Sequence, residues 1–389
     1  MTARVYLDHN ATSPLRPAAR ETMQAALGLD GNASSVHAEG RKARGLIETA
    51  RAQLSAALNA PANGIVFTSG GTEANNLALY GAVGRGATRL FVSAIEHDAT
   101  LCPAADLGER NGVSVETFPV LASGLIDVAW LADRLDGYDL AHEGDFLVAV
   151  MLANNETGVV QPLDDISDIV RRAGGLLFVD AAQGLGRTPL DFLELDADFL
   201  SVSGHKFGGP QGSGALVTRP GVAFAPRQRG GGQEHYRRAG TENVAAIAGL
   251  GAAAEAAAAD APVVERLSEI RDGMANELTS RFPEIIVHGA AAPRLANTLC
   301  FSAPGFSSET QVMALDLAGV AVSAGSACSS GKVKPSHVLR AMGADEAVAG
   351  SAVRVSLGWN STSADAERFV EAWSDAYGRV RDRAPVAAA

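Results

Sequence analysis

The chain has few cysteines. Only Cys102, Cys300 and Cys328 occur in 389 residues, and they form neither a CxxC pair nor a spacing typical of a metal site. This excludes a fold held together by a disulfide framework and gives no support for a metal centre. Free thiols are typical of a reducing compartment, so we expect a cytoplasmic protein.

Long apolar runs are also missing. No stretch is long and apolar enough to span a bilayer, and the N-terminus lacks the basic, apolar and small-residue order of a signal peptide. Basic residues are in the minority, with 32 Lys and Arg against 44 Asp and Glu and a net charge of −12. We therefore expect no nucleic acid and no membrane partner, whereas a basic protein partner is compatible with this charge.

The chain is long enough for two domains, because 389 residues with 47% hydrophobic composition can bury one large core and a smaller one. Between residues 65 and 217, short apolar strands alternate with helical segments, which predicts an α/β fold with a mostly parallel sheet. The expected strands are 89–94, 113–120, 146–152, 176–179, 199–203 and 215–217.

An Ala-rich run at 244–261 predicts a long helix that continues past Pro262 to about residue 280. We place the domain boundary there. The large domain then spans residues 15–260, and a smaller α+β domain combines residues 1–14 with 261–389. The N-terminal strand is expected to return to this smaller domain.

One lysine, Lys206, stands in a setting that favours reactivity. It follows an apolar strand and lies in SGHKFGGP (203–210), among small and glycine residues. Partial burial there would lower its pKa and leave a free amine, which can form a Schiff base with an aldehyde cofactor. The alternative is an ordinary exposed lysine in a Gly-rich turn.

Asp180 ends the apolar run LLFVD (176–180), which has the pattern of a strand buried on both faces. The carboxyl ends of such strands face the ligand crevice of open α/β sheets. A carboxylate there can pair with the protonated pyridine nitrogen of pyridoxal 5′-phosphate (PLP). Alternatively, Asp180 only caps a turn.

The turn at Gly71 and Thr72 lies between a short β-branched strand and a helical segment, in IVFTSGGTEANN (65–76). Backbone N–H groups at a helix N-terminus bind phosphate, and Thr72, Ser203 and His205 could add side-chain donors. The turn has neither the P-loop spacing nor GxGxxG, so nucleotide binding is disfavoured. Without the lysine and the aspartate, it is equally a simple turn with an N-cap.

Nine segments follow one another along the chain: YLDHNATSP (6–14), GNASSVH (31–37), TSGGTEANN (68–76), IEHDA (95–99), NNETGVVQP (154–162), DAAQ (180–183), SGHKFGGP (203–210), RAGTEN (238–243) and GSACSSG (325–331). Together they resemble the cysteine desulfurases of the NifS/IscS type. These are PLP enzymes of the class V aminotransferase fold group, with PLP-transferase fold type I. The resemblance extends to about Gly358.

The resemblance implies roles for further residues. His97 would stack on the cofactor ring and take part in proton transfer, although a histidine after a strand is also a common hydrogen-bonding residue. Asn155 and Gln183 would contact the oxygen on the cofactor ring, and Asn155 alternatively the substrate carboxylate. Arg354 would hold the substrate α-carboxylate, although an arginine on an alternating strand can equally face solvent. A homodimer is also implied, in which Thr241 reaches the phosphate of the neighbouring subunit's cofactor.

Cys328 lies in SAGSACSSGKVKPSH (323–337), where Gly, Ser and Ala predict mobility and two nearby lysines favour the thiolate. These features suit a nucleophile that collects sulfur and carries it to another protein. Cys300, in NTLCF (297–301), is expected in a packed strand, and Cys102 in a helix or the core.

The residues and the resemblance together predict a PLP-dependent conversion of L-cysteine to L-alanine. Lys206 would hold the cofactor and move the Cα proton, and Cys328 would take the sulfur as a persulfide for a sulfur acceptor or an iron–sulfur scaffold protein. Two alternatives stay open: an aminotransferase or lyase acting on another small amino acid, and a catalytically silent scaffold that binds sulfur carriers. After Gly358 the match fades, and we expect the C-terminal segment with which family members dock a scaffold to be short.

Overall fold

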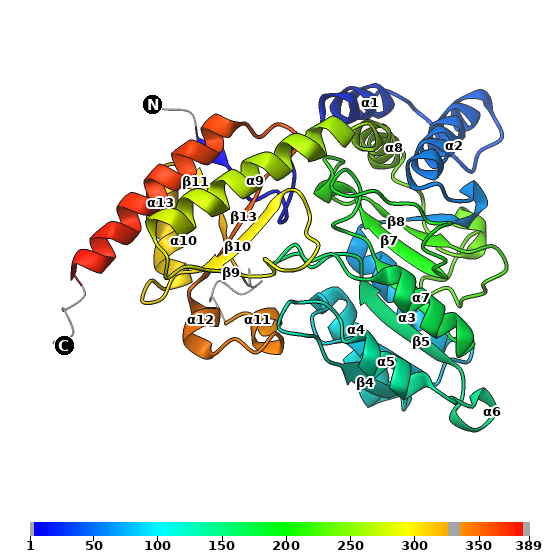
Figure 1. The fold of residues 1–389 in the computed structure, drawn as a ribbon. Coiled ribbons are helices and arrows are strands. Elements are labelled where there is room, and N and C mark those ends of the chain that lie inside the picture. Colours follow the sequence, from blue (N-terminus) through cyan, green and yellow to red (C-terminus); the bar gives the residue numbers. More distant parts are fainter. Residues whose placement is uncertain (1–3, 326–334, 384–389) are drawn as a thin grey trace.

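The computed structural model describes residues 4–325 and 335–383. A large seven-stranded sheet and a smaller four-stranded sheet organise the chain, with helices packed on both (Figure 1). The candidate residues lie where the two sheets approach each other.

The large sheet has the strand order β2-β8-β7-β6-β5-β3-β4. Its strands are β2 (Ile65–Thr68), β3 (Arg89–Ser93), β4 (Ser114–Phe118), β5 (Phe146–Met151), β6 (Leu176–Asp180), β7 (Phe199–Ser203) and β8 (Gly214–Thr218). Only β8 runs antiparallel to its neighbours, and the remaining pairs are parallel. The predicted α/β fold with a mostly parallel sheet is confirmed.

Helices cover both faces of this sheet because successive residues of each buried strand point to opposite sides. In β5, Leu147 and Ala149 pack on one face, and Val148 and Val150 pack on the other. The first face is covered by α3 (Gly71–Val83) and α4 (Asp98–Asn111). The second is covered by α1 (Pro17–Leu27), α2 (Ala38–Leu58), α5 (Val128–Leu135), α7 (Leu163–Arg172) and α8 (Val244–Ala258), while α6 (Leu140–Glu143) is a short surface helix.

The smaller sheet is antiparallel, in the order β12-β13-β10-β9. Its strands are β9 (Ile286–Val287), β10 (Thr298–Ser302), β12 (Ser323–Ala324) and β13 (Ala352–Ser356). The N-terminal strand β1 (Val5–Tyr6) pairs in parallel with β11 (Val320–Ala321), and Asp8 bridges to Ser356 on β13. The predicted return of the N-terminal strand to this part of the molecule is therefore confirmed.

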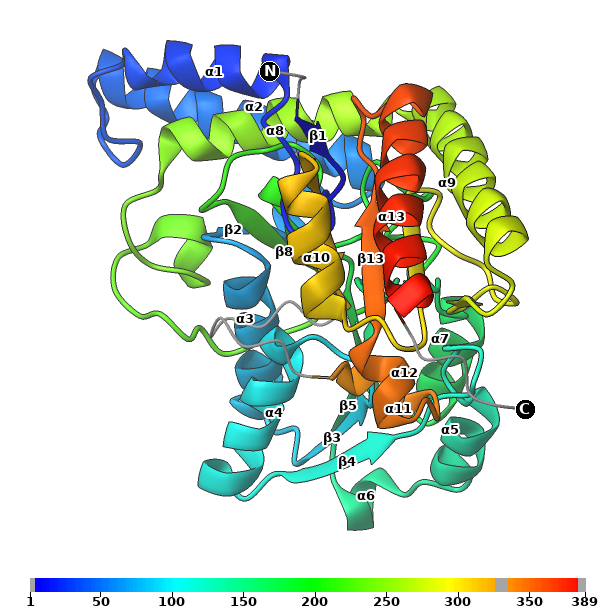
Figure 2. The ribbon, with the colours of Figure 1, turned by 90° about the vertical axis from the view of Figure 1, so that its left-hand side faces the viewer.

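Two long helices, α9 (Ala261–Arg281) and α13 (Ser363–Arg383), lie side by side over the smaller sheet (Figure 2). Their core includes the buried side chains Phe301, Phe369 and Trp373. The remaining helices are α10 (Ser308–Leu317), α11 (His337–Ala341) and α12 (Glu346–Gly350). Cys300 lies fully buried on β10, as predicted.

One sequence expectation on the helices was wrong. Helices α8 and α9 are not one continuous helix but are bent by 69° at a short break. The break precedes Pro262, because a proline in the first turn of a helix loses no hydrogen bond, and Asp260 at the break pairs with the buried Arg16. Cys102 lies on a helix, α4, which is one of its two expected settings, and it is exposed.

We searched the described helices for membrane spans. Within residues 4–325 and 335–383, no single helix is long and apolar enough to cross a membrane. The bent pair formed by α8 and α9 passes a test of length and composition alone.

Candidate active site

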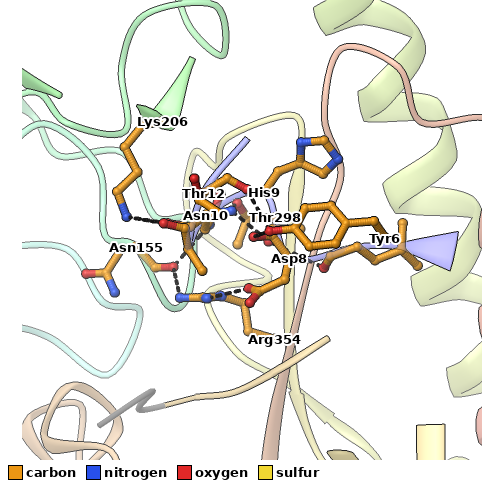
Figure 3. Close-up of polar contacts among 12 residues, drawn as sticks. Tyr6, Asp8, His9, Asn10, Thr12, Asn155, Lys206, Thr298 and Arg354 are labelled. Atoms are coloured by element: carbon orange, nitrogen blue, oxygen red, sulfur yellow. Dashed lines mark hydrogen bonds and ion pairs between the residues drawn. The ribbon is translucent and has the colours of Figure 1, made fainter. Parts of the chain in front are cut away.

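The candidate residues meet at the carboxyl ends of β6 and β7. Asp180 is the last residue of β6, Ser203 is the last of β7, and Lys206 ends the short 3₁₀ helix Gly204–Lys206 that follows. Arg354 on β13 and the turn after β1 approach them from the side of the smaller sheet (Figure 3). The site thus lies at the edge where open α/β sheets bind their ligands.

Lys206 is largely buried, and its amine is held by backbone oxygens. The Nζ atom donates to the main-chain oxygens of Asn10 at 2.6 Å and Ala11 at 3.1 Å. Burial and, to a smaller extent, the positive charges of Arg187 and Arg354 lower the pKa of this amine to about 7, against the opposing effect of Asp180 and Asp8. The predicted partial burial and lowered pKa are confirmed. A large fraction of the amine is therefore neutral and nucleophilic near pH 7.

Asp180 is a buried carboxylate held by two donors. Its Oδ2 accepts a hydrogen bond from Asn75 Nδ2 at 2.7 Å, and its Oδ1 accepts one from the Ala182 N–H at 2.9 Å. Glu96 lies behind it, and burial together with the negative charge of Asp180 raises the pKa of Glu96 well above its usual range. The raised pKa favours the protonated form of Glu96 beside Asp180.

The turn before α3 brings Gly71 against the end of β7. A Cβ atom placed on Gly71 would lie 3.2 Å from the Cβ of Ser203, so a side chain there would crowd this contact. The first N–H groups of a helix have no partner within the helix and are suited to bind an anion. Thr72 lies exposed in the same first turn, where its hydroxyl can reach such a ligand. Gly71 thus lies against Ser203, and Thr72 follows it in the same turn.

Arg354 is buried, with only 3% of its surface exposed, so the alternative of a solvent-facing arginine is wrong. Its Nη2 donates to Asp8 Oδ1 at 2.7 Å, and its Nη1 donates to the main-chain oxygen of Asn155 at 3.1 Å (Figure 3). Its Nε atom is buried without a hydrogen-bond partner. A buried guanidinium with a free N–H is suited to bind a carboxylate.

The turn after β1 connects the two sides of the site, and sequence reasoning missed its role. The Asn10 main-chain oxygen accepts from Lys206 and, at 3.2 Å, from Gln183 Nε2. The Asn10 side chain donates from Nδ2 to the main-chain oxygen of Asn155 at 3.0 Å and to Thr298 Oγ1 at 2.9 Å. A signal was present, because Asp8 to Thr12 is a polar cluster directly after a strand, but it was interpreted only as a turn.

The settings of the other predicted residues differ. His97, between β3 and α4, is exposed and accepts the Ala99 N–H at 3.0 Å as the N-cap of α4. His205 is half-buried beside Lys206, and burial lowers its pKa to about 4. Thr241 is exposed in the segment before α8. Cys328 lies outside the residues that the structure describes.

These groups fit PLP. The cofactor needs an amine for its aldehyde, a carboxylate for its pyridine nitrogen and donors for its phosphate. Lys206, Asp180 and the N-terminus of α3 supply these three groups. Two further buried atoms, Asn75 Oδ1 and Gln183 Oε1, have no hydrogen-bond partner. The Gln183 Nε2 atom carries two hydrogens and donates one to Asn10, so the second can donate to an oxygen on the cofactor ring.

Comparisons with known proteins agree with this chemistry. The family model "Aminotransferase class-V" matches residues 5–369. The chain is 40% identical over 370 residues to "Cysteine desulfurase IscS" of Dictyoglomus turgidum, covering 94% of this chain and 92% of that protein. It is 40% identical over 393 residues to a "Cysteine desulfurase" of Cereibacter sphaeroides, covering 99% and 98% of the two chains.

Solved structures show the same architecture. A NifS-like protein from Rickettsia africae superposes with a TM-score of 0.87 at 33% identity, covering 96% of this chain and 99% of that one. A structure described as "SspA in complex with cysteine" superposes with a TM-score of 0.80 at 30% identity, covering 92% and 100%. Fold and site thus define a PLP-dependent enzyme, and the chain belongs to the class V aminotransferase family. Within that family it is a member of the NifS/IscS-type cysteine desulfurases.

Proposed function

We propose that the protein is a PLP-dependent cysteine desulfurase that converts L-cysteine to L-alanine and transfers the sulfur to Cys328. The observation that carries the proposal is the Lys206 amine, which is buried, has its pKa lowered to about 7, and is within reach of the charges of both Asp180 and Arg354. Such an amine can both bind an aldehyde cofactor and move a proton.

PLP, when bound, supplies an electron sink for the negative charge that develops at the substrate Cα. Asp180 would hold the ring nitrogen protonated, and Gly71, Thr72, Ser203 and His205 would hold the phosphate. Gln183 would contact the oxygen on the ring.

The substrate is held and deprotonated by residues from both sides of the site. Arg354 would bind the α-carboxylate, with Asn155 beside it, which orients the Cα–H bond toward Lys206. Lys206 would then take the Cα proton at Nζ.

Sulfur transfer requires a second nucleophile. The Cys328 thiolate would attack the substrate sulfur, forming a sulfur–sulfur bond while the carbon–sulfur bond breaks and its electron pair remains with the carbon. A proton delivered with the help of His97 would complete alanine. The persulfide on Cys328 would then pass to a sulfur-acceptor or iron–sulfur scaffold protein. A thiol with this role must stay reduced, which favours the cytoplasm.

We also propose a division into a large PLP-binding domain, 15–260, and a small domain, 1–14 with 261–389, that carries Cys328. The 69° bend between α8 and α9 supports it, because α8 packs with α1 and α2 while α9 packs with α13.

We propose a homodimer in which Thr241 reaches the neighbouring cofactor's phosphate. The loop before α8 supports this. Glu234, His235 and Tyr236 all have positive φ angles, of 44°, 56° and 64°, which non-glycine residues rarely adopt. The buried ion pair of Glu234 with Arg51 holds this loop, and Tyr236 is 75% exposed beside it. Strain and exposure together suit a surface built for a second copy. A monomeric mass in solution with full activity would refute the dimer.

The proposed function is tested by reacting the purified protein with L-cysteine and analysing both products. We expect alanine to form and the peptide containing Cys328 to gain one sulfur atom. Consumption of a 2-oxo acid as amino acceptor, with no sulfur on Cys328, would favour the aminotransferase alternative. If L-cysteine is not consumed at all, the alternative of a catalytically silent scaffold that binds sulfur carriers is favoured.

A further inference from the structure

Arg187 lies between β6 and β7 and is almost fully buried, with 6% of its surface exposed. Its Nη2 donates to the main-chain oxygen of Lys206 at 2.7 Å and to that of His9 at 2.9 Å. One nitrogen of this guanidinium therefore ties the backbone of the lysine to the N-terminal turn. If the Lys206 loop or the turn containing His9 moved, a buried hydrogen bond to the charged guanidinium of Arg187 would break.

The charge of Arg187 is unusual because nothing neutralises it. In the part of the chain that the structure describes, no carboxylate pairs with Arg187, and its Nη1 is buried without a hydrogen-bond partner. Burying an unpaired cation costs several kcal/mol, so such groups are rare outside functional sites.

A second buried arginine near the same loop, Arg16, has its charge paired with a carboxylate, as is usual for buried arginines. Arg16 is also buried and donates from Nε to the main-chain oxygen of Phe207 at 2.8 Å, the residue after Lys206. Its guanidinium, however, forms an ion pair with the buried carboxylate of Asp260. Two arginines thus hold adjacent carbonyls of the lysine loop, and of the two only Arg187 has no carboxylate partner among the described residues. Burial and the charge of Arg354 lower the pKa of Arg187 to about 9, so it is still charged near pH 7.

We propose that Arg187 is a positioning residue for the cofactor lysine, which fixes the Lys206 backbone against the N-terminal turn and places an unpaired positive charge beside the Lys206 amine. This rests on the proposed function in that Lys206 is taken as the lysine that binds PLP. Arg187 touches neither substrate nor cofactor in this role and acts only through Lys206.

Burial is the largest cause of the lowered pKa of the Lys206 amine, and Arg187 is the largest of the charges that act on it. Arg187 and Arg354 lower the pKa, and Asp180 and Asp8 raise it. Arg354 is paired with Asp8, so its effect is partly cancelled.

The titratable groups near Arg187 do not obscure the titration of the Lys206 amine. Burial and the charge of Arg187 lower the pKa of His9 to about 3, and burial with the neighbouring charges lowers that of His205 to about 4. Both imidazoles are therefore neutral above pH 6. Burial raises the pKa of Glu156 to about 7, but Glu156 faces Arg354 rather than Arg187, so its titration is common to all variants.

The test is a pH titration of the visible absorbance of the PLP-loaded enzyme, which reports the protonation of the nitrogen joining Lys206 to the cofactor. Arg187→Gln keeps a donor for the two carbonyls and removes the charge, whereas Arg187→Lys keeps the charge. We expect the midpoint to rise by about one pH unit in R187Q and to stay near the wild-type value in R187K. Arg16→Gln is the matched control, because Arg16 is not among the charges that act on Lys206.

An unchanged midpoint in R187Q, or a rise in R187K as large as that in R187Q, overturns the proposal. If R187Q does not retain PLP, competitive amine labelling of the cofactor-free full chain across pH measures the Lys206 amine directly, and the same upward shift is expected. This measurement also separates the two hypotheses. Borohydride trapping of PLP away from Lys206 in the wild type would refute the proposed function, while the labelling would still decide the effect of Arg187.

Discussion

The Nη2 atom of Arg354 donates a hydrogen bond to Asp8 Oδ1 at 2.7 Å, although the two residues are 346 positions apart in the chain. This ion pair joins β13, near the C-terminal end, to the turn after β1, near the N-terminal end. The same turn accepts the Lys206 amine through Asn10 (Figure 3). The lysine loop of the large sheet and the arginine of the smaller sheet are therefore positioned by one short N-terminal segment.

The first prediction concerns Lys206. Lys206→Ala removes the nucleophilic amine, so PLP should no longer be trapped on the chain by borohydride, and activity should fall by at least about a hundredfold. Peptide mapping of the reduced wild-type protein should place the label on Lys206. Lys42→Ala, on the exposed surface of α2, is the control and should change neither result. A label on any other lysine would show that the assignment is wrong.

The second prediction concerns Arg354. Arg354→Lys keeps a positive charge but loses the planar fork that holds a carboxylate through two hydrogen bonds. We expect KM for L-cysteine to rise by about tenfold or more, which corresponds to about 1.4 kcal/mol or more. Steady-state kinetics measure this change. Arg340→Lys, on the exposed side of α11, should leave KM unchanged. A change in kcat alone would instead indicate that Arg354 does not anchor the substrate.

Sequence patterns located the parts of the site that depend on local structure. Lys206, Asp180 and Gly71 each follow a strand that the apolar pattern marks, so strand alternation and turn chemistry were enough to place them at one sheet edge. The expectation that Arg354 holds the substrate carboxylate came from the family resemblance and not from a local pattern. The structure shows that the Arg354 side chain is buried.

The contacts that local patterns missed depend on tertiary structure. Asp8 and Asn10 gain their role only when β1 pairs with β11, far along the chain. A charged residue in a turn, such as Arg187, is usually exposed. The packing of the turn against the lysine loop buries Arg187 instead. The helix expected to continue past Pro262 is instead broken just before this proline, which lies in the first turn of α9, and this break depends on the tertiary pairing of Asp260 with Arg16.

The third prediction concerns the pH dependence of stability and depends on Glu156. This carboxyl is 4% exposed, accepts a hydrogen bond from Ser336 Oγ, and has its pKa raised by burial from 4.5 to about 7. A raised pKa means that the folded state holds the proton more tightly than the unfolded state. The contribution of Glu156 to stability is therefore fully present below pH 4.5 and is lost as pH rises through 7.

Glu156→Gln keeps an oxygen for Ser336 and cannot ionise. Relative to the wild type, this variant should become more stable as pH increases from 4 to 8, by up to about 3 kcal/mol. Thermal melting across this pH range measures the effect. Glu109→Gln, on the exposed surface of α4, is the control and should follow the wild type. A constant difference in Tm between E156Q and the wild type would contradict the prediction.

The fourth prediction separates desulfurase from aminotransferase and depends on Cys328, which lies outside the described residues. Cys328→Ser should still bind PLP and still bind L-cysteine, because these steps use Lys206 and Arg354. Release of sulfide and alanine should nevertheless fall by at least about a hundredfold, since the variant lacks the nucleophile that accepts sulfur.

The other two cysteines are the controls for this experiment. Cys102→Ser changes an exposed position on α4 and should leave turnover unaffected. Cys300→Ala removes a fully buried thiol from β10, so any loss of turnover should be accompanied by a lower Tm, because the cavity destabilises the fold by about 1 kcal/mol or more. If C328S releases sulfide from L-cysteine at nearly the wild-type rate, the persulfide mechanism is wrong here. The site would then act on amino acids through Lys206 alone, as in an aminotransferase or lyase.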